Sequence, residues 1–227
     1  MDRLSAIKKS FLDAVFVPVC SECERRGAWV CAYCLPSVQP IDQPACLRCG
    51  SLTASGCQCW NLPSEITSMQ SVYPLSGWVR SSIHRLKYGG ESARAEMLAS
   101  HLALLDDTLS SADILIPVPM HRKRLQYRGF NQAERIAHHA GKACGVPISR
   151  VILRTADTGT QVGRGLTARW AAVEGAFECT DPGTIVGRNV VIVDDVITTG
   201  ATVSHCAIAL MRAGAASVSA ISIARGE

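Results

Sequence analysis

The distribution of hydrophobic and polar residues changes once along the chain, between residues 61 and 68. After that stretch, short apolar runs predict buried strands at 69–74, 114–118, 190–193 and 217–223. Apolar residues that recur every three or four positions predict helices at 79–86, 92–105, 130–144 and 202–213. The stretch 151–177 predicts two strands around an irregular loop. This alternation predicts an α/β fold with a mainly parallel, doubly wound sheet, whose site lies at the carboxyl ends of the strands.

The residues before this stretch have a different pattern and predict a second, smaller domain. Apolar residues at helical spacing predict an amphipathic helix over 4–17. The segment that follows has almost no aliphatic core, so we expect it to need bound metal in order to fold. The polar stretch 61–68 contains Pro63 and marks the boundary, which predicts domains at 1–62 and 66–227.

Cysteines dominate the smaller domain, where eight of the eleven lie at spacings C-x2-C-x7-C-x2-C-x11-C-x2-C-x7-C-x-C. Zn²⁺ prefers four thiolates in a tetrahedron, and C-x2-C places two sulfur atoms on one tight turn. The near-repeat predicts structural zinc sites at Cys20, Cys23, Cys31 and Cys34 and at Cys46, Cys49, Cys57 and Cys59. Spacing leaves a cross-braced pairing open. It also leaves the number of zinc sites at one or two, because the C-x-C pair is sterically tighter.

Composition and charge predict a folded protein of the cytoplasm. Of the 227 residues, 19% are charged, and the formal net charge is +4. No apolar run approaches the ~18–20 residues that a membrane helix needs, so we expect no membrane insertion. The first 19 residues lack the continuous apolar core and cleavage site of a signal peptide. A reducing compartment favours metal over the alternative, a disulfide-rich secreted module. The oligomeric state stays open.

Residues 190–202 carry the most chemical information. The apolar run Val190–Val193 is followed by two adjacent carboxylates, Asp194 and Asp195, and then by a small-residue loop at 198–202. That loop opens a helix, and the unpaired N–H groups of a helix N-terminus can hold a phosphate. Carboxylates would repel a bare phosphate, so they favour a ligand that also carries sugar hydroxyls or Mg²⁺. A generic strand with a capped helix would not explain two consecutive acids.

A basic stretch joins the predicted strand 114–118 to the predicted helix 130–144. Residues 122–135 hold five basic side chains against one acid, Glu134. By the carboxyl-end rule this stretch lies beside residues 194–202, where guanidinium groups can bind phosphate oxygens in a bidentate fork. Clustered Lys and Arg also bind other polyanions, so the alternative is a surface that faces nucleic acid.

These segments resemble two nested protein families. The order of strand, acid pair, Thr-Thr-Gly loop and helix resembles the type I phosphoribosyltransferases, which use 5-phosphoribosyl-1-pyrophosphate (PRPP). The cysteine pairs, Leu-Lys-Tyr-Gly at 86–89, Pro-Val-Pro-x-His at 117–121 and Arg-Gly-Phe-Asn-Gln at 128–132 extend the likeness. With them, nearly the whole chain resembles the ComF family of competence proteins, which includes the GntX-like proteins. The resemblance implies a type I phosphoribosyltransferase-like domain that follows an N-terminal zinc ribbon.

The resemblance also implies roles for individual residues. Asp194 and Asp195 would contact the ribose and stabilise the transition state. The 5′-phosphate would bind at Thr198, Thr199, Gly200, Ala201 and Thr202. The pyrophosphate would lie near Arg122, Arg128, Asn131 and Lys87. Mg²⁺ would bridge the pyrophosphate and the ribose hydroxyls, and the segment 155–175 would close over the site and exclude water.

The expected function is that of a Mg²⁺-dependent phosphoribosyltransferase that binds PRPP and serves DNA uptake. Single-stranded DNA and a helicase-like competence protein are the further partners that the resemblance implies. One alternative is a non-catalytic competence factor that binds single-stranded DNA or a nucleotide. Another is a nucleotide-salvage enzyme whose zinc module only supports folding or dimerisation. No segment shows a base-specific pocket, so the sequence does not identify the acceptor.

Overall fold

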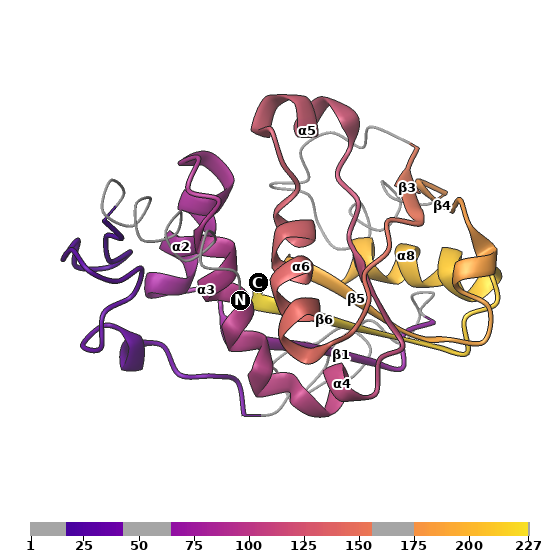
Figure 1. Cartoon of the computed structure of the whole chain (residues 1–227), viewed down its shortest axis with the longest axis horizontal. Coiled ribbons are helices and arrows are strands. Elements are labelled where there is room, and N and C mark those ends of the chain that lie inside the picture. Colours follow the sequence, from indigo (N-terminus) through magenta and orange to yellow (C-terminus); the bar gives the residue numbers. More distant parts are fainter. Residues whose placement is uncertain (1–16, 43–64, 156–174, 227) are drawn as a thin grey trace, which may run out of the picture.

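A parallel four-stranded sheet forms the centre of the computed structural model, which describes residues 17–42, 65–155 and 175–226 (Figure 1). Its strands lie in the order β1 (Ser68–Pro74), β6 (Ser217–Arg225), β5 (Asn189–Ile197) and β2 (Ile114–Pro117). Every neighbouring pair is parallel. A separate antiparallel pair consists of β3 (Ile152–Arg154) and β4 (Phe177–Cys179). The predicted α/β fold and its parallel sheet are confirmed.

Helices cover both faces of this sheet. Along β5, Val190 and Ile192 face one core whereas Val191 and Val193 face the other, because successive strand residues point to opposite sides. The first core is covered by α8 (Ala201–Arg212). The second is covered by α2 (Gly77–Tyr88), α3 (Arg94–Ser100) and α6 (Gln132–Cys144). Burial on both faces explains why this strand is a continuous apolar run in the sequence.

Three elements differ from the predicted ones. β5 continues to Ile197, so the two carboxylates lie within the strand and not after it. The basic stretch, expected as a connection, contains the helix α5 (Arg122–Arg128). The prediction of one helix over 92–105 is wrong: α3 ends at Ser100, and the 3₁₀ helix η3 (His101–Leu105) and α4 (Asp106–Ser110) follow. α3 packs against α6, whereas η3 packs against β1 and β6, and the tighter 3₁₀ turn brings the buried Leu102 onto the sheet.

The cysteine-containing residues 17–42 lie against α2 and α3 (Figure 1). They include the 3₁₀ helix η1 (Leu35–Ser37), whose Leu35 carbonyl accepts a hydrogen bond from Trp78 Nε1 at 3.2 Å. The Ile41 N–H donates to the Val72 carbonyl of β1 at 2.8 Å. Nearly all of the predicted helix 4–17, and all four cysteines between 46 and 59, fall outside the described residues. Within the described ranges, no helix has both the length and the apolar character to cross a bilayer.

Candidate functional site

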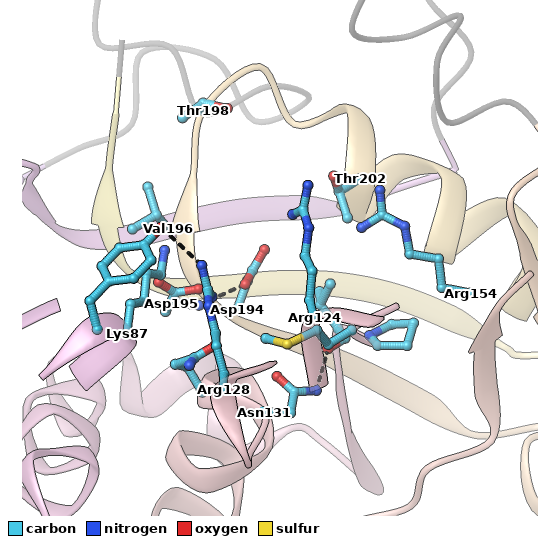
Figure 2. A pocket seen from close by; sticks show the side chains of 15 residues that line it. Lys87, Arg124, Arg128, Asn131, Arg154, Asp194, Asp195, Val196, Thr198 and Thr202 are labelled. Atoms are coloured by element: carbon cyan, nitrogen blue, oxygen red, sulfur yellow. Dashed lines mark hydrogen bonds and ion pairs between the residues drawn. The ribbon is translucent and has the colours of Figure 1, made fainter. Parts of the chain in front are cut away.

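A cleft of about 390 Å³ opens at the carboxyl ends of β2 and β5 (Figure 2). Its walls come from the end of α2, the β2–α6 connection, β3 and the β5–α8 turn. This is the edge of the sheet at which the fold class predicts a site. The side chains that line the cleft are Lys87, Tyr88, Val118, Pro119, Met120, Arg124, Arg128, Asn131, Gln132, Arg154, Asp194, Asp195, Val196, Thr198 and Thr202.

Two carboxylates and one ammonium group meet in this cleft. The Asp195 N–H donates to Asp194 Oδ1 at 2.8 Å, and the Asp195 carboxylate, in a residue only 7% exposed, pairs with Lys87 Nζ from the last turn of α2. Burial, and after it the charge of Asp195, raise the pKa of Asp194 well above its usual range. Burial alone would lower the pKa of Lys87, but the charges of Asp195 and Asp194 outweigh it, so this pKa is raised. Lys87 is therefore held as a cation against the acid pair.

The loop that follows β5 forms a small hollow at the N-terminus of α8. Gly200, at φ +76°, is the N-cap residue of this helix, and the left-handed conformation at that position favours glycine. The Ala201 N–H donates to Thr199 Oγ1 at 3.4 Å. The hollow, about 30 Å³, is lined by Asp194 and by residues 196–203. Free N–H groups at the start of a long helix make this hollow suitable for a phosphate group.

Arginines form much of the remaining wall. Arg124 and Arg128 lie four residues apart on α5, so they share one face of the helix and both line the cleft. Arg128 donates to Tyr88 Oη at 2.9 Å and lies 4.8 Å from the centre of that ring. Figure 2 shows Lys87 and Arg128 on the side of Asp195, and Arg124 and Arg154 on the side of Thr202. The cleft therefore presents cations on both sides of the acid pair, an arrangement suited to an anionic ligand.

The structure brings together most of the residues that the resemblance implicates. Lys87 and Arg128 line the cleft with the acid pair and the loop. Asn131 also lines it, but its side chain is engaged: Oδ1 accepts from the Ala133 N–H at 3.1 Å and Nδ2 donates to the Val118 carbonyl at 2.9 Å. Arg122, in the first turn of α5, is exposed and does not line the cleft.

Eight cleft residues were not predicted. Four of them carry polar or charged side chains: Tyr88, Arg124, Gln132 and Arg154. The sequence did contain a signal for Arg124. His121 caps α5 by accepting from the Lys123 N–H at 3.4 Å, and Gly129, at φ +78°, ends the helix. Recognising that helix would have placed residue 124 on the face of Arg128. Arg154 lies on the short strand β3, and no local pattern marks it.

The first predicted group of zinc ligands, Cys20, Cys23, Cys31 and Cys34, comes together in space. Their Sγ atoms all lie within 4.8 Å of one another, and those of Cys23 and Cys31 are 3.6 Å apart. Ideal tetrahedral Zn–S bonds of about 2.3 Å would place sulfur atoms about 3.8 Å apart, so this set, the cysteine quartet, fits a structural zinc ion. Within the described residues, this geometry matches the near-repeat pairing. The second predicted group lies outside them.

Thiol ionisation in the quartet is consistent with a bound cation. Burial alone would raise the pKa of Cys20, but hydrogen bonds from backbone N–H groups, those of Cys23 and Cys31 foremost, lower it to about 6. Burial and the neighbouring thiols of Cys23 and Cys31 raise the pKa of Cys34 to about 12. Four thiols this close cannot all ionise without a cation between them, and a zinc ion would supply that charge.

The sheet and its cleft define a phosphoribosyltransferase-type domain. The family described as "Phosphoribosyl transferase domain" matches residues 125–227, which include the acid pair and the loop that follows it. Among solved structures, the glutamine PRPP amidotransferase from B. subtilis is similar over 58% of this chain and 26% of that chain, at 23% identity and a TM-score of 0.37.

Two relatives match most of the chain. The DNA utilization protein YhgH of Escherichia coli K12 is 31% identical over 85% of this chain and 88% of its own length. Competence protein ComFC of Bacillus subtilis is 26% identical over 86% of this chain and 84% of its own length. The chain belongs to the ComF family, together with these DNA utilization and competence proteins.

Proposed function

We propose that the cleft binds PRPP with Mg²⁺ and transfers its phosphoribosyl group to a nitrogen acceptor, with loss of pyrophosphate. One observation carries this proposal: an acid pair and a cationic wall line one cleft, and a phosphate-type hollow adjoins that cleft at Asp194, Thr198 and Thr202. PRPP carries sugar hydroxyls, a terminal phosphate and a pyrophosphate on one molecule, and it can therefore use all three features at once.

In the proposed complex, each part of PRPP meets the group that suits its charge. The 5′-phosphate occupies the hollow at 198–202, where helix N–H groups point. The ribose hydroxyls lie against Asp194 and Asp195. The pyrophosphate lies near Lys87 and Arg128, and it draws the ammonium group away from Asp195. This exchange frees the Asp195 carboxylate for the sugar at the moment of binding.

The chemistry replaces one bond at C1 of the ribose with another. The bond from C1 to the pyrophosphate oxygen breaks, the oxygen keeps the electron pair, and the acceptor nitrogen donates the pair that forms the new bond. Positive charge develops on the ribose ring, and a carboxylate of the acid pair stabilises it at short range. A Mg²⁺ ion carried by PRPP would neutralise the leaving pyrophosphate, and Asp194 and Asp195 supply the carboxylate oxygens that such an ion prefers.

Calorimetric titration with PRPP, with and without Mg²⁺, tests binding, and pyrophosphate release across a panel of nucleobases tests transfer. We expect saturable, Mg²⁺-dependent binding in the wild type. Replacing Asp194 and Asp195 together with asparagine should abolish turnover and leave the zinc content unchanged, which controls for folding. Turnover at the wild-type rate in that variant would refute the mechanism. Pyrophosphate release in the absence of any nucleobase would indicate hydrolysis of PRPP or transfer to another acceptor.

A second candidate function is binding of single-stranded DNA, and α5 favours it. This helix exposes Arg122 and Lys123 together with Tyr127, which is 85% exposed, so it offers cations and an aromatic ring to a polyanion. The names of the relatives, DNA utilization and competence proteins, support a role in the use of incoming DNA. A helicase-like competence protein, which the family resemblance implies, is the partner that we propose for this role. A thiolate metal site supports a reducing compartment, the cytoplasm.

Salt dependence tests this second function. Affinity for a fluorescent oligonucleotide should fall steeply as salt rises, and replacing Arg122 and Lys123 with alanine should reduce the slope. The same variant should bind PRPP as the wild type does, because neither residue lines the cleft. A variant with unchanged DNA affinity and salt slope would remove α5 from the DNA-binding surface.

A further inference from the structure

Ser21 lies between two members of the cysteine quartet and joins them to the α/β domain. It stands between Cys20 and Cys23, and it is buried. Its Oγ lies 2.6 Å from Ser82 Oγ of α2 and accepts from Arg94 Nη1 of α3 at 2.7 Å. One hydroxyl next to the metal ligands therefore connects to two helices of the other domain.

Arg94 makes the positions of these helices depend on the conformation of the turns that carry the cysteine quartet. Its side chain has no exposed surface, and its charge is paired with Glu91. The guanidinium also donates to the Val19 carbonyl at 3.0 Å and to the Trp29 carbonyl at 3.3 Å, and it lies 4.4 Å from the centre of the Trp29 ring. These acceptors lie on the turns that carry the cysteines. A buried charge that loses its acceptors is strongly destabilised, so the helices cannot keep their positions if these turns rearrange.

The contacts of Ser82 and Arg94 lie on either side, along the chain, of Lys87, the residue that pairs with Asp195. Ser82 lies five residues before Lys87 and Arg94 lies seven residues after it, so the turn that carries Lys87 is held from both sides. Lys87 reaches Asp195 from the last turn of α2, and Tyr88 beside it receives the hydrogen bond of Arg128. Movement at either end of this segment would shift Lys87 relative to the acid pair.

We propose that metal binding at the cysteine quartet and ligand binding in the cleft are energetically coupled, with Ser21 and Arg94 as positioning residues that act through Lys87. The identity of the ligand, PRPP, rests on the proposed function, whereas the coupling rests on these contacts. Coupling between sites is reciprocal, so a ligand that needs Lys87 in place must also tighten metal binding. The cysteine-containing residues then hold Lys87 in position in the cleft, in addition to binding metal.

The test uses the full zinc-loaded chain and three variants. Arg94→Met and Ser82→Ala remove the two contacts, and Arg80→Met, the control, removes an exposed charge from α2, the helix of Ser82. Mass spectrometry follows acylation of Lys87, with Lys142 on α6 as an internal reference. We expect Arg94→Met to speed acylation of Lys87 and to weaken PRPP binding, each by about fivefold or more, with Lys142 unchanged. Ser82→Ala should give about two- to fivefold effects, because one hydrogen bond is lost. Arg80→Met should match the wild type.

Reciprocity supplies the second measurement. Saturating PRPP should raise the apparent zinc affinity of the wild type against a competing chelator by about fivefold or more, and Arg94→Met should abolish that increase. The coupling is overturned if zinc-loaded Arg94→Met matches Arg80→Met in Lys87 acylation and in PRPP affinity. If Arg94→Met does not fold, the same comparison is made with Ser82→Ala. If the wild type binds no PRPP, the proposed function fails, and Lys87 acylation alone decides the coupling.

Discussion

Replacing Asp194 with asparagine should stabilise the folded chain at alkaline pH while it abolishes turnover. Burial, and then the charge of Asp195, raise the pKa of Asp194 in the folded state, whereas in the unfolded chain this carboxyl ionises near the ordinary value of 3.8. Between these two pKa values the unfolded chain has released a proton that the folded chain still holds. The free energy of unfolding therefore falls as pH rises, by about 1.4 kcal/mol for each pH unit in that window.

The asparagine variant lacks this penalty and keeps the local contacts. Its side-chain carbonyl has the shape of the carboxylate and can still accept the Asp195 N–H, which lies 2.8 Å from Asp194 Oδ1 in the wild type. Urea unfolding measured between pH 6 and pH 9 should show the variant more stable than the wild type, by a margin that grows with pH until the wild-type carboxyl ionises. Staying at pH 6 and above keeps proton competition at the cysteine quartet small.

A matched control separates this effect from the loss of any surface charge. Asp107→Asn, at an exposed position on α4, should change the free energy of unfolding by no more than about 0.5 kcal/mol at any pH in this range. The linkage between the raised pKa of Asp194 and stability is refuted if Asp194→Asn and the wild type have the same free energy of unfolding throughout pH 6 to pH 9. It is also refuted if the variant is the less stable protein throughout.

Three further variants test the cleft, the fold and the quartet. Arg128→Met should weaken binding of Mg-pyrophosphate, measured by calorimetry, about tenfold or more, whereas Arg122→Met, outside the cleft, should not change it. Equal losses of affinity in the two variants would contradict the placement of Arg128, and not Arg122, in the cleft. Gly77→Ala should reduce the free energy of unfolding in urea by about 1–2 kcal/mol. The reason is that φ is +43° at this position and the new Cβ would lie 2.9 Å from Val38 Cγ2. An unchanged unfolding midpoint would contradict that clash. Cys23→Ala should lower the zinc content of the purified chain, measured by mass spectrometry, by about one equivalent, because a structural site needs all four thiolates; full zinc content would exclude the quartet as a zinc site.

The acid pair and its loop were predictable because everything that positions them is local. Strand, carboxylates, loop and helix follow one another within residues 190–202, so hydrophobic pattern and turn chemistry bring them together without any distant contact. The cysteine quartet was predictable for a similar reason, since each C-x2-C pair sets two ligands on one turn. The ligand that these groups bind stays a prediction.

The choice between neighbouring arginines was not predictable in the same way. The resemblance pointed to Arg122, but the basic stretch folds into α5, and a helix separates side chains two positions apart onto different faces. Arg124 therefore lines the cleft with Arg128, whereas Arg122 faces solvent. The single helix expected over 92–105 failed because packing on the sheet, which local periodicity does not describe, turned its second half into a 3₁₀ helix.

By itself the sequence determined the local chemistry of this protein: a carboxylate pair beside a phosphate-type loop, and paired cysteines suited to zinc. Only the tertiary structure decided which cations share the cleft with the carboxylates, because Lys87 and Arg154 come from segments far from residue 194. It alone also brought Ser21 onto Ser82, a partner 61 residues away. Contacts of this range depend on how helices pack on the sheet, and that packing depends on the whole chain rather than on any one segment.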